Sequence, residues 1–190
     1  MAFQTHIPAN MTFQDFLAVI QISRILADGF DKKEHPHPLH PPSTNNLTHL
    51  QDPDLLRAAL APEVTADYTA VRPQWTRQTY TTQAFIDEWL GPNHLGSSKA
   101  LITFHLLGMP YFTRITDGEI VVNYQQLACH ARRAGGDDWG SPECGIEGHS
   151  DGKSWMEQTF VKVEGEWKIG VIRPSIHYRP GSLETVGRHD

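Results

Sequence analysis

The strongest constraint on the fold is a series of long strand-like runs in the second half of the chain. Four such runs occupy residues 100–115, 119–133, 154–163 and 166–178. Along them apolar and polar side chains alternate with the period of two that a half-buried strand requires. Thr116-Asp117-Gly118 separates the first pair of runs, and Glu164-Gly165 separates the second. Because short glycine-containing connections fit hairpin turns, the sequence predicts two consecutive hairpins and a curved, mostly antiparallel sheet.

The first half of the chain indicates helices. Behind the capping residue Thr12, apolar side chains follow helical spacing to about Phe30. Further expected elements are a helix at 53–60 capped by Asp52, a strand at 64–71 carrying Tyr68, and a helix at 81–91. Helices followed by strands predict an α+β fold, in which N-terminal helices pack against the sheet.

The connections suggest one domain with a core at about 11–180. With 190 residues and 39% hydrophobic content, the chain is long enough for one well-packed core and short for two. Residues 32–51, rich in proline and histidine, are expected to form a surface loop, and 181–190 a tail. The glycine-rich stretch 134–152 is expected to form a loop near the mouth of a cavity.

Composition narrows the class of partner. A net charge of −6 and a pI near 6.0 offer no broad basic surface for nucleic acid, so a small organic molecule is the expected ligand. Cys129 and Cys144 form no CxxC pair, which argues against a disulfide framework. The sequence shows neither a signal peptide nor a membrane-spanning run, so we expect a cytoplasmic protein without membrane contact.

Four side chains that handle protons lie where they can converge on one cavity. His105 and His130 belong to neighbouring predicted strands, and Asp31 and Tyr68 to the ends of earlier elements. Imidazole takes or gives a proton near neutrality, a carboxylate orients it, and a phenol polarises a carbonyl. A single strand histidine is equally explained as a satisfied polar residue. The combination favours general acid/base chemistry without a cofactor.

Strand alternation adds a polar stripe to these candidates. It places His130 on one face with Tyr124 and Gln126, and Ser154 on one face with Met156. Polar residues among apolar neighbours on one face indicate the lining of a cavity.

Metal binding is a weaker interpretation. His35, His37 and His40 alternate in a proline-rich segment, and Cys144 lies near His149. Histidines interrupted by prolines are more typical of a solvated loop than of a zinc site, which needs three or four ligands at fixed distances. No metal site is expected.

The order of elements resembles the cone-shaped fold of the nuclear transport factor 2-like (SnoaL-like) superfamily and, within it, the scytalone dehydratase family. The segments that carry the resemblance are MTFQDFLAVIQISRILADGFDKKE, LLRAALAPEVTADYTAV, FHLLG, NYQQLACHARR and GKSWMEQTFVKVEGEWKIGVIRP. By position, the resemblance implies an active-site aspartate at Asp31, a carbonyl-polarising tyrosine at Tyr68, active-site histidines at His105 and His130, and a pocket serine at Ser154. It also implies a homotrimer.

Two positions depart from the family pattern. Phe30 stands where the family has a second tyrosine that helps to hold a water, and Met156 stands where it has an asparagine that contacts a substrate hydroxyl. Since both changes remove polar groups, they favour a substrate that is less hydroxylated than scytalone.

The resemblance implies a cofactor-independent lyase that dehydrates a polyketide-derived cyclic hydroxy ketone in fungal secondary metabolism. The alternatives are a cyclase, isomerase, decarboxylase or pericyclase using the same pocket, and a non-catalytic ligand-binding module, because fold alone does not fix activity.

Overall fold

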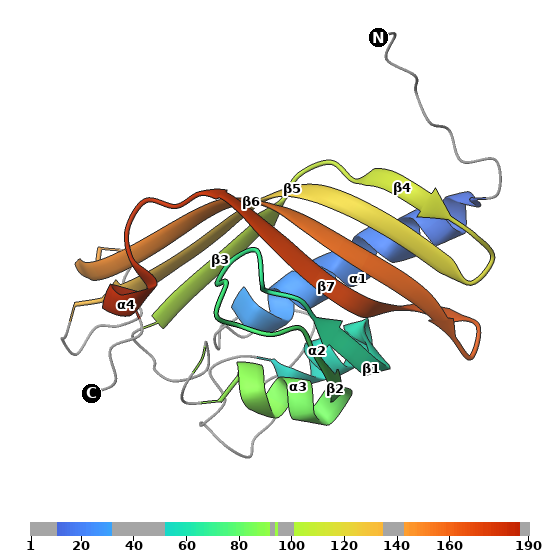
Figure 1. The fold of residues 1–190 in the computed structure, drawn as a ribbon, viewed down its shortest axis with the longest axis horizontal. Coiled ribbons are helices and arrows are strands. Elements are labelled where there is room, and N and C mark those ends of the chain that lie inside the picture. The colour runs from blue at the N-terminus through green and yellow to red at the C-terminus, as the bar shows by residue number, and fades with distance from the viewer. Residues whose placement is uncertain (1–10, 32–51, 92–93, 95–100, 135–142, 187–190) are drawn as a thin grey trace, which may run out of the picture.

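A long helix lies along one face of a curved sheet (Figure 1). The computed structural model describes residues 11–31, 52–91, 94, 101–134 and 143–186. The elements are α1 (Phe13–Asp31), α2 (Pro53–Ala59), β1 (Leu60–Ala66), β2 (Gln78–Thr81), α3 (Thr82–Trp89), β3 (Leu101–Leu107), β4 (Tyr111–Ile115), β5 (Glu119–Arg133), β6 (Ile146–Val163), β7 (Glu166–Tyr178) and α4 (Leu183–Val186). Within the described ranges, the strands form one sheet in the order β2-β1-β7-β6-β5-β3, and β4 pairs with β5.

Helix α1 begins and ends close to where the sequence predicts. Asp15 donates its backbone N–H to Thr12 Oγ1 at 3.1 Å, and Thr12 returns its N–H to the Asp15 carboxylate at 3.2 Å, which is a capping box. The same carboxylate accepts a hydrogen bond from Trp167 Nε1 at 2.7 Å, so the start of the helix is tied to β7. Among the described residues, no helix is both long and apolar enough to cross a membrane.

The strand predicted at 64–71 begins and ends earlier than expected, and this changes the position of Tyr68. Strand β1 ends at Ala66, and Tyr68 lies in the turn that follows. The Tyr68 carbonyl accepts hydrogen bonds from the N–H groups of Val71 and Arg72, at 2.9 and 3.0 Å. These turn bonds replace the strand bonds that the prediction assumed, because the Asp67 side chain bonds the backbone and hydroxyl of Thr69 and bends the chain.

The strand predicted at 100–115 is two strands. Strand β3 ends at Leu107 and β4 begins at Tyr111, and both pair with β5. Pro110 lies between them and has no N–H to offer the ladder, so pairing is interrupted there. The hairpin turn at Thr116-Asp117-Gly118 is confirmed, since the Thr116 N–H bonds the Glu119 carbonyl at 2.8 Å.

The glycine-rich segment and the predicted tail both contain more structure than expected. Strand β6 begins at Ile146, so residues 146–152 pair with the end of β5 and are not loop. A Cβ at Gly148 would lie 2.5 Å from the carbonyl oxygen of Thr185, so the glycine lets α4 pack directly on the strand. Residues 183–186 of the expected tail form that helix, α4.

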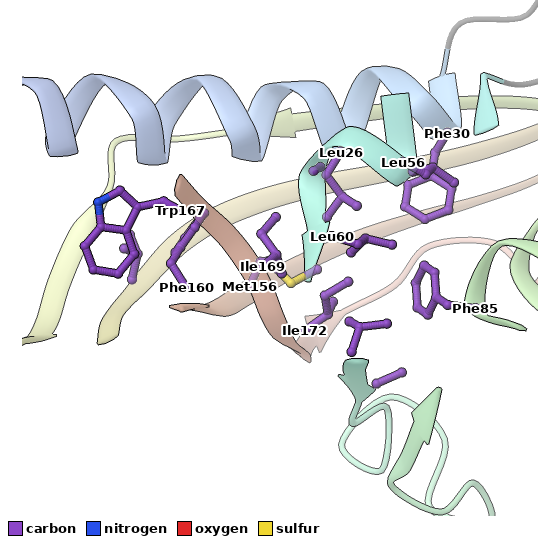
Figure 2. Close-up of a cluster of buried hydrophobic side chains, with 14 of the residues drawn as sticks. Leu26, Phe30, Leu56, Leu60, Phe85, Met156, Phe160, Trp167, Ile169 and Ile172 are labelled. Carbon is purple, nitrogen blue, oxygen red and sulfur yellow. The ribbon is translucent and has the colours of Figure 1, made fainter. Parts of the chain in front are cut away.

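One apolar core fills the space between α1 and the sheet. Figure 2 shows Leu26 and Phe30 of α1 on one side and Met156, Phe160, Ile169 and Ile172 of β6 and β7 on the other. Phe85 of α3 and Leu60 of β1 extend this cluster under the helices. The parallel pairing of β1 with β7, in which Ala66 lies opposite Ile172, joins the first half of the chain to the last strand. The sheet is therefore mixed and mostly antiparallel.

Candidate active site

A cavity of about 260 Å³ lies between α1, the sheet and the turn after β1. Seven of the residues singled out from the sequence line it: Phe30, Tyr68, His105, Gln126, His130, Ser154 and Met156. They come from α1, the turn after β1, β3, β5 and β6, so the cavity exists only in the folded chain.

Asp31 holds His105 in a fixed orientation from behind the cavity wall. Asp31 Oδ1 lies 2.7 Å from Nδ1 of His105, and Oδ2 accepts the backbone N–H of the same residue at 2.6 Å. Since the carboxylate can only accept at Oδ1, the neutral form of the ring carries its hydrogen on Nδ1 and its lone pair on Nε2. Helix α1 ends at Asp31, which places the carboxylate against β3.

His130 lies beside His105 and is kept uncharged. The two ring centroids are 5.4 Å apart with nearly perpendicular planes. Burial and the neighbouring His105 lower the pKa of His130 to about 4, although backbone hydrogen bonds to Ser150 and Ala128 act in the opposite direction. At neutral pH His130 is therefore a neutral imidazole.

Tyr68 presents a protonated phenol to the same cavity. Its ring packs against Trp89 at 4.5 Å and Trp75 at 5.9 Å between centroids. Burial among these rings raises the pKa of the phenol well above its usual value, so the hydroxyl remains a donor. Among the described residues no hydrogen bond to this hydroxyl is formed, which leaves it available to a ligand.

Ser154 and Tyr124 have different places in the site. Ser154 lines the cavity, and its hydroxyl lies 3.2 Å from Oε1 of Gln126. Tyr124, which the polar stripe suggested as a lining residue, is buried in the core behind the wall. Its hydroxyl bonds Ser23 Oγ at 2.8 Å, and Ser23 in turn donates to Gln158 Oε1 at 2.6 Å. Burial raises the pKa of Tyr124 to about 12, so this network contains a neutral phenol.

The two departures from the family pattern lie where a ligand would touch them. The Phe30 ring is 5.9 Å from the His105 ring, between centroids, and Met156 lines the sheet side of the cavity. Both are buried (Figure 2), so the wall is apolar where a tyrosine and an asparagine would make it polar.

Several lining residues were not identified from the sequence as site residues. Ser23, Gln158 and Ser150 line the cavity, as does the indole of Trp89, whose buried Nε1 has no partner in the described part of the chain. Gln158 lies two residues beyond Met156 on the same strand, so strand alternation, which assigns Ser154 and Met156 to one face, could have found it. Ser23 lies on the buried face of α1 and gave no separate signal.

The described residues contain no group of three or more side chains suited to a metal ion. Cys144 Sγ contacts backbone carbonyls of Ala134 and Gly145, both at 3.6 Å, and forms no hydrogen bond with His149 in the described part of the chain. His35, His37 and His40, considered as ligands above, lie outside the described residues.

Comparison with known proteins connects this geometry to a family of enzymes. The family model described as scytalone dehydratase matches residues 45–189. Dehydratase cfoI of Aspergillus candidus is 42% identical over 188 residues, which span 99% of this chain and 97% of that protein. Scytalone dehydratase arp1 of Aspergillus fumigatus is 25% identical, over 94% of this chain and 92% of that protein.

Solved structures show the fold to be nuclear transport factor 2-like. A Streptomyces avermitilis protein of that family superposes with a TM-score of 0.59 at 12% identity, over 88% of this chain and 99% of that chain. Hexachlorocyclohexane dehydrochlorinase LinA-type3 of Novosphingobium barchaimii superposes with a TM-score of 0.59 at 10% identity, over 93% of this chain and 94% of that chain.

Proposed function

The chain belongs to the scytalone dehydratase family, and we propose that it removes water from a cyclic β-hydroxy ketone. By homology it is a dehydratase, which is a type of lyase. We place the substrate among polyketide-derived compounds of fungal secondary metabolism, because the dehydratases that resemble the chain come from fungi such as Aspergillus candidus and Pestalotiopsis microspora. The observation that carries the proposal is the Asp31–His105 pair at the wall of a cavity shared with His130 and Tyr68.

In this proposal His105 moves the proton. Its bare Nε2 takes the hydrogen from the carbon next to the ketone, and Asp31 stabilises the imidazolium that forms. The imidazolium then gives this proton to the hydroxyl on the next carbon. The carbon–oxygen bond breaks, water leaves, and the electron pair of the former carbon–hydrogen bond becomes the new double bond. His105 returns to its starting state, so the cycle balances without a cofactor.

Tyr68 and His130 stabilise the intermediate charge. The Tyr68 hydroxyl donates to the ketone oxygen, where negative charge develops as the proton leaves. Neutral His130 offers a hydrogen bond to the departing hydroxyl. A second imidazolium beside His105 would oppose protonation of His105, so the low pKa of His130 favours the reaction.

Loss of one water distinguishes this reaction from isomerisation and decarboxylation by product mass.

With scytalone and a panel of related cyclic hydroxy ketones as substrates, we expect His105→Ala and His130→Ala each to lower turnover by roughly two orders of magnitude or more. The exposed His149→Gln is the matched control and should leave turnover unchanged. Full activity in either folded alanine variant removes that histidine from the mechanism.

We also propose that the chain folds as a single domain and assembles as a homotrimer through the outer face of the sheet. Phe104, Leu106, Leu127 and Trp155 point away from the cavity on β3, β5 and β6 and are exposed. Leu106 and Leu127 are cross-strand partners, so this apolar surface is continuous. Light scattering at micromolar concentration should give three times the mass of one chain, and the mass of a single chain contradicts the assembly.

A further inference from the structure

The cavity wall carries two arginines and, among the residues that the structure describes, no carboxylate. Arg72 and Arg179 are both lining residues. The whole chain has 22 acidic and 16 lysine or arginine residues, so a wall with only cationic charges is the reverse of its overall composition. Asp31 does not change this balance, because it lies behind His105 and both of its oxygens are bonded to that residue.

The topology brings the two arginines together. Strands β1 and β7 are parallel neighbours, with Ala66 opposite Ile172. Both strands point the same way, and although β7 continues to Tyr178, six residues beyond the partner of Ala66, the segments that follow β1 and β7 both reach the wall of the one cavity. Arg72 lies in the turn after β1, and Arg179 directly follows β7.

Arg72 is held in place by its surroundings. Its backbone N–H bonds the Tyr68 carbonyl at 3.0 Å, and its carbonyl accepts from the Trp75 N–H at 2.9 Å. The guanidinium lies over the Trp75 ring, 5.1 Å from its centroid, and Trp75 also lines the cavity. A cation fixed over an aromatic wall is already positioned for a ligand.

Neither guanidinium is neutralised within the described part of the chain. Burial and the nearby Arg72 lower the pKa of Arg179, whose side chain forms no hydrogen bond or ion pair there. Arg173, on strand β7 itself, shows the usual arrangement instead, since it pairs with Asp67 at 3.1 Å and Glu157 at 2.6 Å. Two half-buried like charges without a carboxylate repel each other until an anion lies between them.

We propose that Arg72 and Arg179 form an anion subsite of the cavity, which binds a carboxylate carried by the substrate. The proposal deepens the proposed function and rests on it, by defining the substrate as a ring-bearing hydroxy ketone acid. The planar forks of arginine match a carboxylate in geometry and charge. The ring of the substrate would lie against the apolar wall, and the carboxylate would take no part in bond breaking but would fix the ketone relative to Tyr68.

Two bicyclic probes of equal shape test the subsite without any turnover. Naphthoate carries a carboxylate and naphthamide a neutral amide, and the tryptophans in the wall provide a fluorescence signal for both. We expect naphthoate to bind at least about 10-fold more tightly, as charge-assisted hydrogen bonds exceed neutral ones. Added salt should weaken the binding of naphthoate much more than that of naphthamide.

Variants assign this preference to the two arginines. Arg72→Gln with Arg179→Gln should reduce the ratio of the two affinities to about one, while each Arg→Lys change should retain part of it because the charge remains. Arg77→Gln is the matched control. Arg77 carries the same charge and lies in the same segment between β1 and β2, but it is exposed and does not line the cavity. Should the double glutamine variant fail to fold, Arg179→Gln alone must still lower the ratio.

The outcomes separate this inference from the proposed reaction. Equal affinities in the parent protein, no saturable binding of naphthoate at millimolar concentration, or a preference that survives both glutamine changes overturns the subsite. If the preference depends on the arginines but the His105 and His130 variants dehydrate their substrates normally, the subsite stands and the proposed mechanism fails.

Discussion

At the scale of single residues, the chemistry of the cavity depends on a few side chains whose neighbours fix their protonation. His105 differs from His130 because a carboxylate bonds its Nδ1, whereas His130 is buried beside another imidazole. Burial disfavours the charged form of both Tyr68 and His130. Tyr68 therefore keeps its proton, and His130 stays without one.

Phe30 and Met156 set the polarity of the wall and hence the choice of substrate. We predict that Phe30→Tyr combined with Met156→Asn raises the rate of scytalone dehydration by roughly 10-fold relative to the parent, since a buried unpaired substrate hydroxyl costs about 1–3 kcal/mol. Steady-state kinetics with scytalone measures the effect. Phe13→Tyr, at an exposed position of α1, is the control for an added phenol. If the parent already dehydrates scytalone as efficiently as its best substrate, the two positions do not determine specificity.

At the scale of elements, the contact between β6 and α4 closes one end of the cavity. Leu183 and Val186 of α4 line the cavity, and the Val186 carbonyl accepts a hydrogen bond from the buried Arg132 at 3.0 Å. The helix can lie this close because residue 148 has no side chain.

Gly148→Ala should therefore displace α4. The added methyl group would lie 2.5 Å from the Thr185 carbonyl oxygen, so we expect a loss of about 1–3 kcal/mol in the free energy of unfolding and several-fold weaker naphthamide binding. Urea denaturation and fluorescence titration measure the two effects. Gly118→Ala is the control, because a methyl there meets no atom within 4 Å. Unchanged stability and affinity in Gly148→Ala would show that α4 does not need this close approach.

At the scale of the whole molecule, burial of His130 couples stability to pH. The folded-state pKa of about 4 lies below the ordinary value near 6.5, so between these values the unfolded chain binds a proton that the folded chain does not. This contribution favours the folded state fully above about pH 6.5 and decreases as the pH falls toward 4.

The quantity compared is the decrease in the free energy of unfolding between pH 7 and pH 4.5. We predict that this decrease is larger in the parent protein than in His130→Gln by on the order of 2 kcal/mol. Urea denaturation at the two pH values measures this difference. Replacing the exposed His149 by Gln should leave the parent's pH dependence in place. A pH dependence in His130→Gln equal to that of the parent would mean that His130 is not the group responsible.

The sequence alone was sufficient to predict the helices, turns and strand faces that have strong local signals. The capping residues Thr12, Asp52 and Thr81 and the glycine-containing turns determine where chain segments start and reverse, and strand alternation assigns His130, Ser154 and Met156 to the inner face. These features depend on neighbours a few residues away, and the pattern of residues records them directly. The family was indicated by a resemblance in the order of the elements and in particular segments, and the family model confirms it.

Only the tertiary structure decided what depends on distant contacts. Residues 146–152 pair with β5, and Tyr124 lies in the core, because each outcome depends on a partner far away in the chain. The end of β1 before Tyr68 has a local cause, the bonds between Asp67 and Thr69, which the apolar pattern of the segment does not show. Arg72 and Arg179 line one cavity from the segments that follow β1 and β7, and no local pattern records the parallel pairing of these two strands. A sequence shows which side chains are available and which face of a strand they occupy, but their meeting in one cavity is determined by packing.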